Sequence, residues 1–175
     1  VGDALRARAT VGGPGYIVGP DDPSGRFAYW PVRIDRGGEV LAPGAPGDPV
    51  QFIDVRDLGA WLVALIENRV MDVFNATGPA SRLAWGDLLE ACRKASSNKS
   101  VLTWVPGDWV AKQGEEVFPI WAPYRGATRG FHMWKNMRAV KAKLKFRPYQ
   151  DTVRDTLAWY KTQSEGGRTK LAGPA

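Results

Sequence analysis

Short apolar runs alternate along this chain with turns that are rich in glycine and proline. Each run suits one strand or one amphipathic helix, and no long linker separates them. In the first half, the pattern predicts a strand end over 9–12, a loop through Gly25, a short helix over 26–37, and strands over 39–43 and 50–53. Strands that alternate with helices favour an α/β fold over an all-β fold.

Helical spacing is clearest after the strand at 50–53. The apolar residues of a predicted helix over 56–67 are Leu58, Trp61, Leu62, Leu65 and Ile66. Asp54 and Asp57 stand at its start, where we expect capping and compensation of the helix dipole rather than contact with a substrate. Strands are predicted over 73–78 and 101–106, with a break at Gly78–Pro79, and the remaining helices over 84–96, 107–113, 135–144 and 151–163.

These elements form one expected unit, residues 1–163, followed by a polar tail over 164–175 that we expect to be flexible. The 175 residues are 44% hydrophobic, which is enough for one domain with a core. No apolar run approaches the roughly 20 residues that span a bilayer. The single cysteine, Cys92, cannot form an internal disulfide, so we expect a cytoplasmic location.

The net charge of +6 comes largely from one region. From Val117 to Gln150 there is no Asp or Glu, while eight basic residues occur: Arg125, Arg129, Lys135, Arg138, Lys141, Lys143, Lys145 and Arg147. Such a region suits a polyanion, a single phosphate on a small ligand, or a solvated helix face. No RNA-binding signature or Cys/His pairing accompanies it, so nucleic acid is an unfavoured partner. His132 has no partner at metal-ligand spacing, and we assign no metal site.

Five segments, in this order, resemble one enzyme family: PGYIVGPDDP (14–23), VQFIDVRDLGAWLVALIE (50–67), VFNATGP (73–79), RAVKAKLKFRP (138–148) and TVRDTLAWY (152–160). Together they resemble the C-terminal half of NAD-dependent epimerase/dehydratase proteins, which are extended short-chain dehydrogenases/reductases. The resemblance runs from about residue 9 to residue 162. It implies an α/β fold made of the last Rossmann strands plus a small mixed α/β lobe, which is the substrate-binding portion of that family.

In this family a Rossmann half comes first, with a glycine-rich loop for the cofactor pyrophosphate and a Tyr-x-x-x-Lys pair for proton transfer. The present chain contains neither feature. It has no G-x-x-G-x-x-G motif, and none of its five tyrosines has a lysine four residues later. We therefore assign no catalytic residue. The resemblance implies NAD or NADP as the cofactor of the full-length enzyme. It also implies a missing Rossmann half, in the same chain or in another, as the partner.

The resemblance also places the site residues. Pro14 and Gly15 would lie near the nicotinamide carboxamide, and Tyr16 would reach both cofactor and substrate, although a plain turn that ends a strand is an equal alternative. The further residues assigned to the substrate are Trp30, Gln51, Arg125 and Arg129, the two arginines as partners for an anionic group or else as exposed surface charges. Two arginines common in the family are replaced by Gly13 and Val50, which argues against a nucleotide-sugar substrate.

Two functions of different classes follow. The first is the substrate-binding part of an NAD(P)-dependent epimerase, dehydratase or reductase that acts on a small hydroxy or carbonyl compound and is inactive alone. The second is a non-catalytic scaffold or interaction subunit. Without preceding strands, the strand at 9–12 would expose an unpaired edge and an apolar face, and pairing with another chain or a second copy would cover both.

Overall fold

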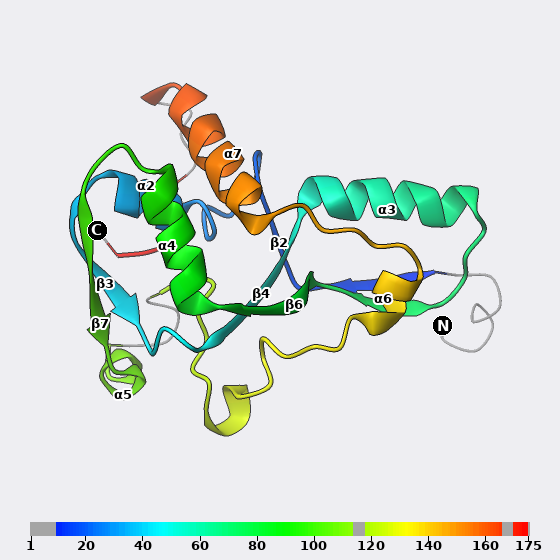
Figure 1. Cartoon of the computed structure of the whole chain (residues 1–175), viewed down its shortest axis with the longest axis horizontal. Coiled ribbons are helices and arrows are strands. Elements are labelled where there is room, and N and C mark those ends of the chain that lie inside the picture. Colours follow the sequence, from blue (N-terminus) through cyan, green and yellow to red (C-terminus); the bar gives the residue numbers. More distant parts are fainter. Residues whose placement is uncertain (1–9, 114–117, 166–169, 175) are drawn as a thin grey trace.

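Strands and helices alternate along the chain in the computed structural model of this protein, which describes residues 10–113, 118–165 and 170–174. The elements form two lobes at opposite ends of an elongated molecule, and a central sheet joins them (Figure 1). We call these the small lobe and the large lobe. The α/β prediction is confirmed.

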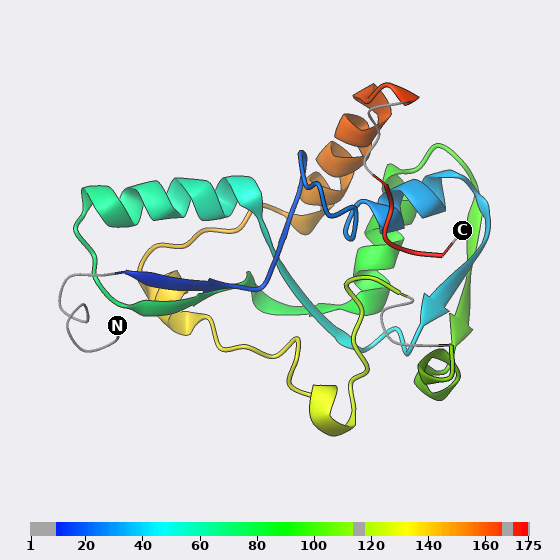
Figure 2. The ribbon, with the colours of Figure 1, turned by 180° about the vertical axis from the view of Figure 1, so that it is seen from behind.

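The small lobe contains strands β1 (Val11–Pro14) and β5 (Val73–Ala76) with helices α3 (Val55–Glu67) and α6 (Met137–Lys141). β1 and β5 pair in parallel, and the two views of the ribbon show them side by side beneath α3 (Figures 1 and 2). Their buried contacts form a small cluster of Ile53, Leu58, Trp61, Leu65, Phe74, Ala76, Ala139 and Leu144.

The central sheet has the order β2–β4–β6, with bounds Tyr16–Val18, Pro49–Asp54 and Gly78–Ala84. β2 runs parallel to β4, and β6 runs antiparallel to it. Two predictions were wrong here, because 16–18 was expected in a loop and Gly78–Pro79 as a break. Gly78 instead begins β6 where the chain packs tightly, since a Cβ there would lie 2.2 Å from Cε1 of Phe146.

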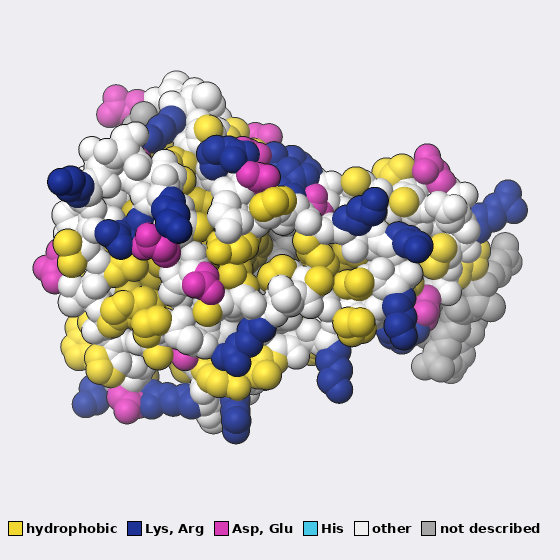
Figure 3. Space-filling view, viewed as in Figure 1, with side chains coloured by type: hydrophobic (Ala, Val, Ile, Leu, Met, Phe, Trp, Pro, Cys, Tyr) yellow, Lys and Arg dark blue, Asp and Glu magenta, His cyan; other side chains and the backbone are white. Residues whose placement is uncertain are grey.

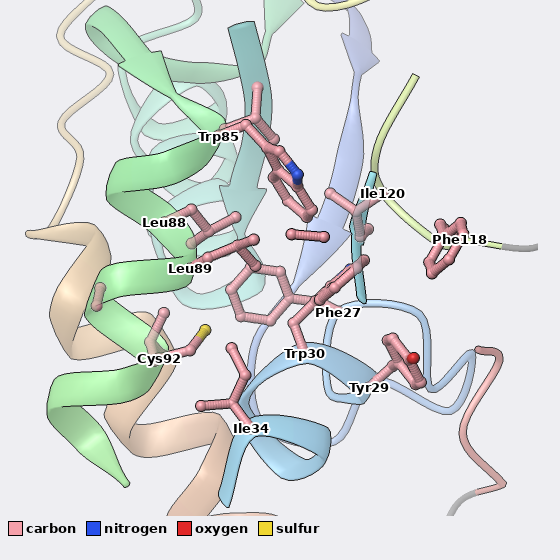
Figure 4. Close-up of a cluster of buried hydrophobic side chains, with 14 of the residues drawn as sticks. Phe27, Tyr29, Trp30, Ile34, Trp85, Leu88, Leu89, Cys92, Phe118 and Ile120 are labelled. Atoms are coloured by element: carbon pink, nitrogen blue, oxygen red, sulfur yellow. The ribbon is translucent and has the colours of Figure 1, made fainter. Parts of the chain in front are cut away.

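The large lobe contains the parallel strands β3 (Gly38–Pro43) and β7 (Ser100–Val105) and most of the helices. These helices are α2 (Tyr29–Asp35), α4 (Trp85–Ala95), α5 (Gly107–Ala111) and α7 (Tyr149–Thr162). α2, α4 and α7 pack on one another, and side chains from α2 and α4 meet in a closed cluster around Trp30 and Trp85 (Figure 4). Both tryptophan side chains are fully buried.

A buried carboxylate joins the start of α3 to α7. Asp54 accepts hydrogen bonds from the backbone N–H of Arg56 and from Oγ1 of Thr152, each at 2.9 Å, so the predicted cap is confirmed. Burial alone would raise the pKa of Asp54, but the hydrogen bonds from Arg56 and Thr152 and the charge of Arg147 lower it overall. The carboxylate is therefore held ionised between two lobes.

Two further segments differ from expectation. The helix predicted over 135–144 covers only Met137–Lys141, because Lys143 adopts a positive φ of 69° and the chain turns to bury Leu144. Residues 170–174, expected in a flexible tail, lie against the large lobe, where Leu171 packs on the closed cluster around Trp30 and Trp85. Among the described helices, none has the length and apolar character that a bilayer crossing requires.

Candidate functional site

The chain changes sheets at Gly15, and the candidate site lies at that point. β1 pairs with β5 as far as Pro14 opposite Ala76, whereas β2 begins its pairing with β4 at Tyr16 opposite Phe52. The two strand pairs separate here and leave a pocket of about 440 Å³ at the carboxyl ends of β1 and β5. In open α/β sheets, ligands bind at such switch points beyond the carboxyl ends of the strands.

Five parts of the chain line this pocket. Its floor is the β1–β2 connection. β5 contributes Asn75, with Thr77 just after it, and β4 contributes Gln51. Arg26 comes from the loop before α2. The opposite wall is a segment that we call the strap, residues 131–136, which contributes Phe131, His132 and Trp134. A pocket of this volume, mostly apolar with a few polar groups, is typical of small-molecule sites.

Side-chain amides hold the strap across the strand ends. Gln51 donates from Nε2 to the carbonyl oxygen of Trp134 at 3.1 Å and accepts from the Trp134 backbone N–H at 2.9 Å. Asn75 donates from Nδ2 to the carbonyl oxygen of Lys135 at 3.0 Å. Gln51 and Asn75 are thus anchors of the strap as well as parts of the pocket wall.

Two buried residues of the strap complete its attachment. Asn136 donates from Nδ2 to the carbonyl oxygens of Thr77 at 2.8 Å and Pro79 at 3.0 Å. His132 accepts the backbone N–H of Gln51 at Nδ1, at 3.0 Å, so its Nε2 must carry the proton that it shares with the carbonyl oxygen of Ile120 at 2.8 Å. Burial lowers the pKa of His132, which keeps the ring neutral.

Position 15 needs a glycine because the Thr77 side chain leaves no space for a Cβ, and not because of its backbone angles. A Cβ at this position would lie 2.6 Å from Oγ1 of Thr77 and 3.1 Å from its Cβ. Thr77 is 2% exposed, and its hydroxyl has no hydrogen-bond partner among the described residues. The close approach leaves a stretch of bare backbone, Pro14–Gly15, facing the pocket.

Aromatic rings surround Tyr16 at the pocket wall. Its ring centroid lies 5.9 Å from that of Phe131 and 6.0 Å from that of His132, and the guanidinium carbon of Arg26 lies 5.1 Å from it. Offset rings and a cation at these distances stabilise one another. The cluster makes one face of the pocket aromatic, with the Tyr16 and Phe131 rings tilted by 53° to each other.

The structure brings together four of the residues predicted from the sequence and separates three others from them. Pro14, Gly15, Tyr16 and Gln51 all line the pocket. Trp30 does not, and its prediction as a substrate contact was wrong. Its side chain is 0% exposed in the closed cluster of the large lobe, and its indole N–H donates to the carbonyl oxygen of Pro119 at 2.7 Å.

Arg125 and Arg129 also lie outside this pocket. Arg125 forms an ion pair with Asp108 beside a separate cavity of about 260 Å³ near α5. The guanidinium carbon of Arg129 lies 5.6 Å from the ring centroid of Tyr124. Neither arginine therefore lies with Pro14, Gly15, Tyr16 and Gln51 at the candidate site.

Sequence reasoning missed Arg26, Thr77 and the strap. The strap has no periodic pattern, and only its mixture of aromatic side chains with a lone histidine distinguishes it in the sequence. The expectation of no metal site was based on the spacing around His132. Within the residues described, no three His, Cys, Asp or Glu side chains are grouped so that they could hold a metal ion.

Comparison with known proteins gives structural matches only. No protein-family model matches the chain, and no curated protein matches its sequence. UDP-glucose 4-epimerase from Thermotoga maritima, solved with UDP-glucose, matches with a TM-score of 0.61 and 16% identity. UDP-glucose 4-epimerase from Thermus thermophilus, solved with NAD, gives 0.58 and 15%. RMD from Pseudomonas aeruginosa, solved with NADPH, gives 0.59 and 17%.

These alignments cover most of the present chain but only part of each enzyme. They include 87%, 89% and 89% of this chain, and 45%, 47% and 49% of the three enzymes in the order given. The chain therefore spans about half the length of the solved structures that it matches. It has the α/β fold of part of these NAD(P)-binding enzymes.

Proposed function

We propose that this chain is the substrate-binding part of an NAD(P)-dependent epimerase, dehydratase or reductase that acts on a small hydroxy or carbonyl compound. The observation that carries the proposal is the position of the pocket at the Gly15 switch point, beyond the carboxyl ends of β1 and β5. The structural similarity to NAD(P)-binding enzymes supports the cofactor class.

The bare backbone of Pro14–Gly15 would receive the nicotinamide ring. Neither residue presents a long side chain, and Gly15 is packed directly on Thr77, so a flat ring can approach the main chain closely. Tyr16 and Gln51 would then line the space for the substrate. The cofactor would supply or accept a hydride, while the residues of this chain orient the ring and exclude water.

The group that transfers the proton would not be one of the residues of this sequence. His132 is the nearest base to the pocket, but both of its ring nitrogens are already bonded, and burial lowers its pKa. The chain has no Tyr-x-x-x-Lys pair and no glycine-rich phosphate loop. A dinucleotide-binding half, in the same protein or in another chain, would therefore complete the active site.

The small lobe offers a surface for that half. Among the described strands, β1 pairs only with β5, so its second edge presents unpaired backbone groups. Apolar side chains are exposed near this edge, and Figure 3 shows hydrophobic side chains among charged ones over α3. Val11 and Val73 are 52% and 53% exposed, and on α3 Val63 and Ile66 are 55% and 77% exposed. This exposure also favours the second candidate, a non-catalytic interaction subunit.

Reduced nicotinamide mononucleotide tests the proposal, because it carries the reactive ring without the adenosine half. The ring absorbs where tryptophan emits, so its binding at the pocket would quench Trp134. We expect saturable quenching in the native chain and a smaller effect in Trp134→Phe. Trp109→Phe, which removes a 41% exposed tryptophan on α5, should retain the full effect.

Non-saturable quenching, or quenching that Trp134→Phe leaves unchanged, would contradict nicotinamide binding at this pocket and favour the interaction subunit. Gly15→Val is the complementary variant. Its side chain would fill the space against Thr77 and disturb the ring-binding backbone, so we expect loss of the saturable component.

A further inference from the structure

One positively charged side chain, that of Arg26, lines the pocket. Of the described side chains that line it, only Arg26 carries a formal charge, because His132 is held neutral and the others are uncharged. No carboxylate is among them. The electrostatic field inside the pocket therefore favours a negative group.

The position of Arg26 is fixed by its neighbours. Gly25 before it has a positive φ of 63°, and a Cβ there would lie 2.2 Å from the carbonyl oxygen of Lys170. Phe27 after it is 1% exposed. The backbone is thus held from both sides while the Arg26 side chain emerges over the face of Tyr16, at 5.1 Å from the ring centroid.

Arg26 also differs from the arginines that have structural roles. Arg56 and Arg147 pair with Asp54, and Arg138 pairs with Asp72. Arg26 forms no ion pair with any of the described residues, and its guanidinium carbon lies over the Tyr16 ring. A guanidinium that stacks on a ring keeps its N–H groups for a planar anion such as carboxylate or phosphate.

We propose that Arg26 binds an anionic group of the substrate, so that the substrate is a hydroxy or oxo compound with a single carboxylate or phosphate. This inference rests on the proposed function and specifies its substrate. The body of the substrate would lie against Tyr16 and Phe131, whose rings are 5.9 Å apart. One cation suits one anionic group, whereas a diphosphate would bring a second group that nothing in the described wall of the pocket neutralises.

Three aromatic probes test the inference by NMR titration of the native chain, followed at the amide of Gly15 and the indole of Trp134. They are mandelate, its neutral amide mandelamide, and phenyl phosphate. We expect the preferred anion to bind about fivefold more tightly than mandelamide, since Arg26 is exposed and solvent screens the pair. Whichever anion is preferred identifies the group as carboxylate or phosphate.

Arg26→Gln should reduce this preference to about one, because it removes the charge. Arg82→Gln is the matched control. Arg82 also lies over a tyrosine ring, at 5.7 Å from the centroid of Tyr124, but it does not line this pocket. It should retain the preference. Arg26→Lys keeps the charge without the planar fork, and we expect an intermediate preference that falls as salt is raised to about 0.5 M.

Three results would overturn the inference: equal binding of the anions and mandelamide by the native chain, a preference that survives in Arg26→Gln, or no binding of any probe. Each is separable from failure of the proposed function. If reduced nicotinamide mononucleotide still quenches Trp134, the nicotinamide site stands and only the anionic substrate is wrong. If the anion preference is present without nicotinamide binding, the pocket binds anions but is not the proposed cofactor site.

Discussion

The two lobes differ in how completely the apolar side chains of a long helix, α4 in the large lobe and α3 in the small lobe, are covered. In the large lobe, Leu88 and Leu89 on α4 are 0% exposed inside a closed cluster. In the small lobe, the helix α3 buries Leu58, Trp61 and Leu65, but four other large apolar residues of the helix are exposed: Val55, Leu62, Val63 and Ile66. The large lobe resembles a complete domain core, and the small lobe resembles one side of a larger core.

This difference agrees with the position of the candidate site. The pocket lies beside the small lobe, on the strand β1 that has one unpaired edge, and not within the closed large lobe. A site completed by a second domain is expected beside a surface whose apolar side chains and strand edge are uncovered. We infer that the large lobe stabilises the chain, while the small lobe and the strap form a surface that a dinucleotide-binding half would complete.

The largest expected contrast is between two leucine-to-alanine substitutions. Leu88→Ala should lower the free energy of unfolding by about 3 kcal/mol, because it leaves a cavity in the closed cluster. Leu62→Ala, at a residue 37% exposed on α3, should lower it by less than about 0.5 kcal/mol. Urea unfolding of both variants measures the difference, and equal losses would show that the two lobes are equally closed.

A second contrast concerns the switch point itself. Gly15→Ala should lower the free energy of unfolding by about 1–3 kcal/mol, because the new methyl group meets Thr77. Gly13→Ala is the matched control, since its nearest neighbour would be the carbonyl oxygen of Phe74 at an ordinary 3.6 Å. The double variant Gly15→Ala with Thr77→Ala should recover most of the loss. No recovery would mean that Thr77 is not the cause.

The pH dependence of stability tests the strap between the lobes. His132 has a pKa lowered from its ordinary value of 6.5, so below pH 6.5 the unfolded chain takes up a proton that the folded chain does not. Stability should therefore be full above pH 6.5 and fall as the pH falls below it, by at most about 1.4 kcal/mol per pH unit. Thermal unfolding of His132→Gln should lack this component. An identical pH profile in that variant would assign the effect elsewhere.

The smallest expected effect is a difference in thiol reactivity without loss of stability. Burial raises the pKa of the Cys92 thiol, and the side chain is 0% exposed in the large lobe. A thiol reagent should modify Cys92 only when the chain unfolds. Ile66→Cys, at a position 77% exposed in the small lobe, should react at once in the folded chain. Rapid modification of Cys92 in the native chain would contradict a closed core.

The sequence predicts the elements whose signals are local. The apolar spacing of α3 and α4 and the run at 50–53 are enough to locate those elements, and the residues that the resemblance assigned to the cofactor, Pro14–Tyr16, line the pocket. β2 and β6 were missed because their strand character depends on pairing with β4, more than thirty residues from β2. Local pattern carries no information on such pairing.

The other part of the site depends on contacts that sequence spacing does not encode. The strap is held by side chains of Gln51, Asn75 and Asn136, so its path follows from hydrogen bonds between distant residues. Trp30 was predicted to contact a ligand because aromatic side chains occur both in cores and in ligand pockets. In the structure its side chain is buried in the core. Arg26 has no local signal at all, since an exposed arginine in a loop is ordinary.

The central claim is that a second unit covers the small lobe at β1 and α3. Hydrogen exchange of this chain alone and of the protein purified from the organism that makes it tests the claim directly. We predict that peptides over 11–14 and 55–67 exchange more slowly in the purified protein, while peptides over 85–95 in α4 exchange equally in both. Equal exchange over 11–14 and 55–67 would contradict a covering unit and leave the small lobe as a finished surface.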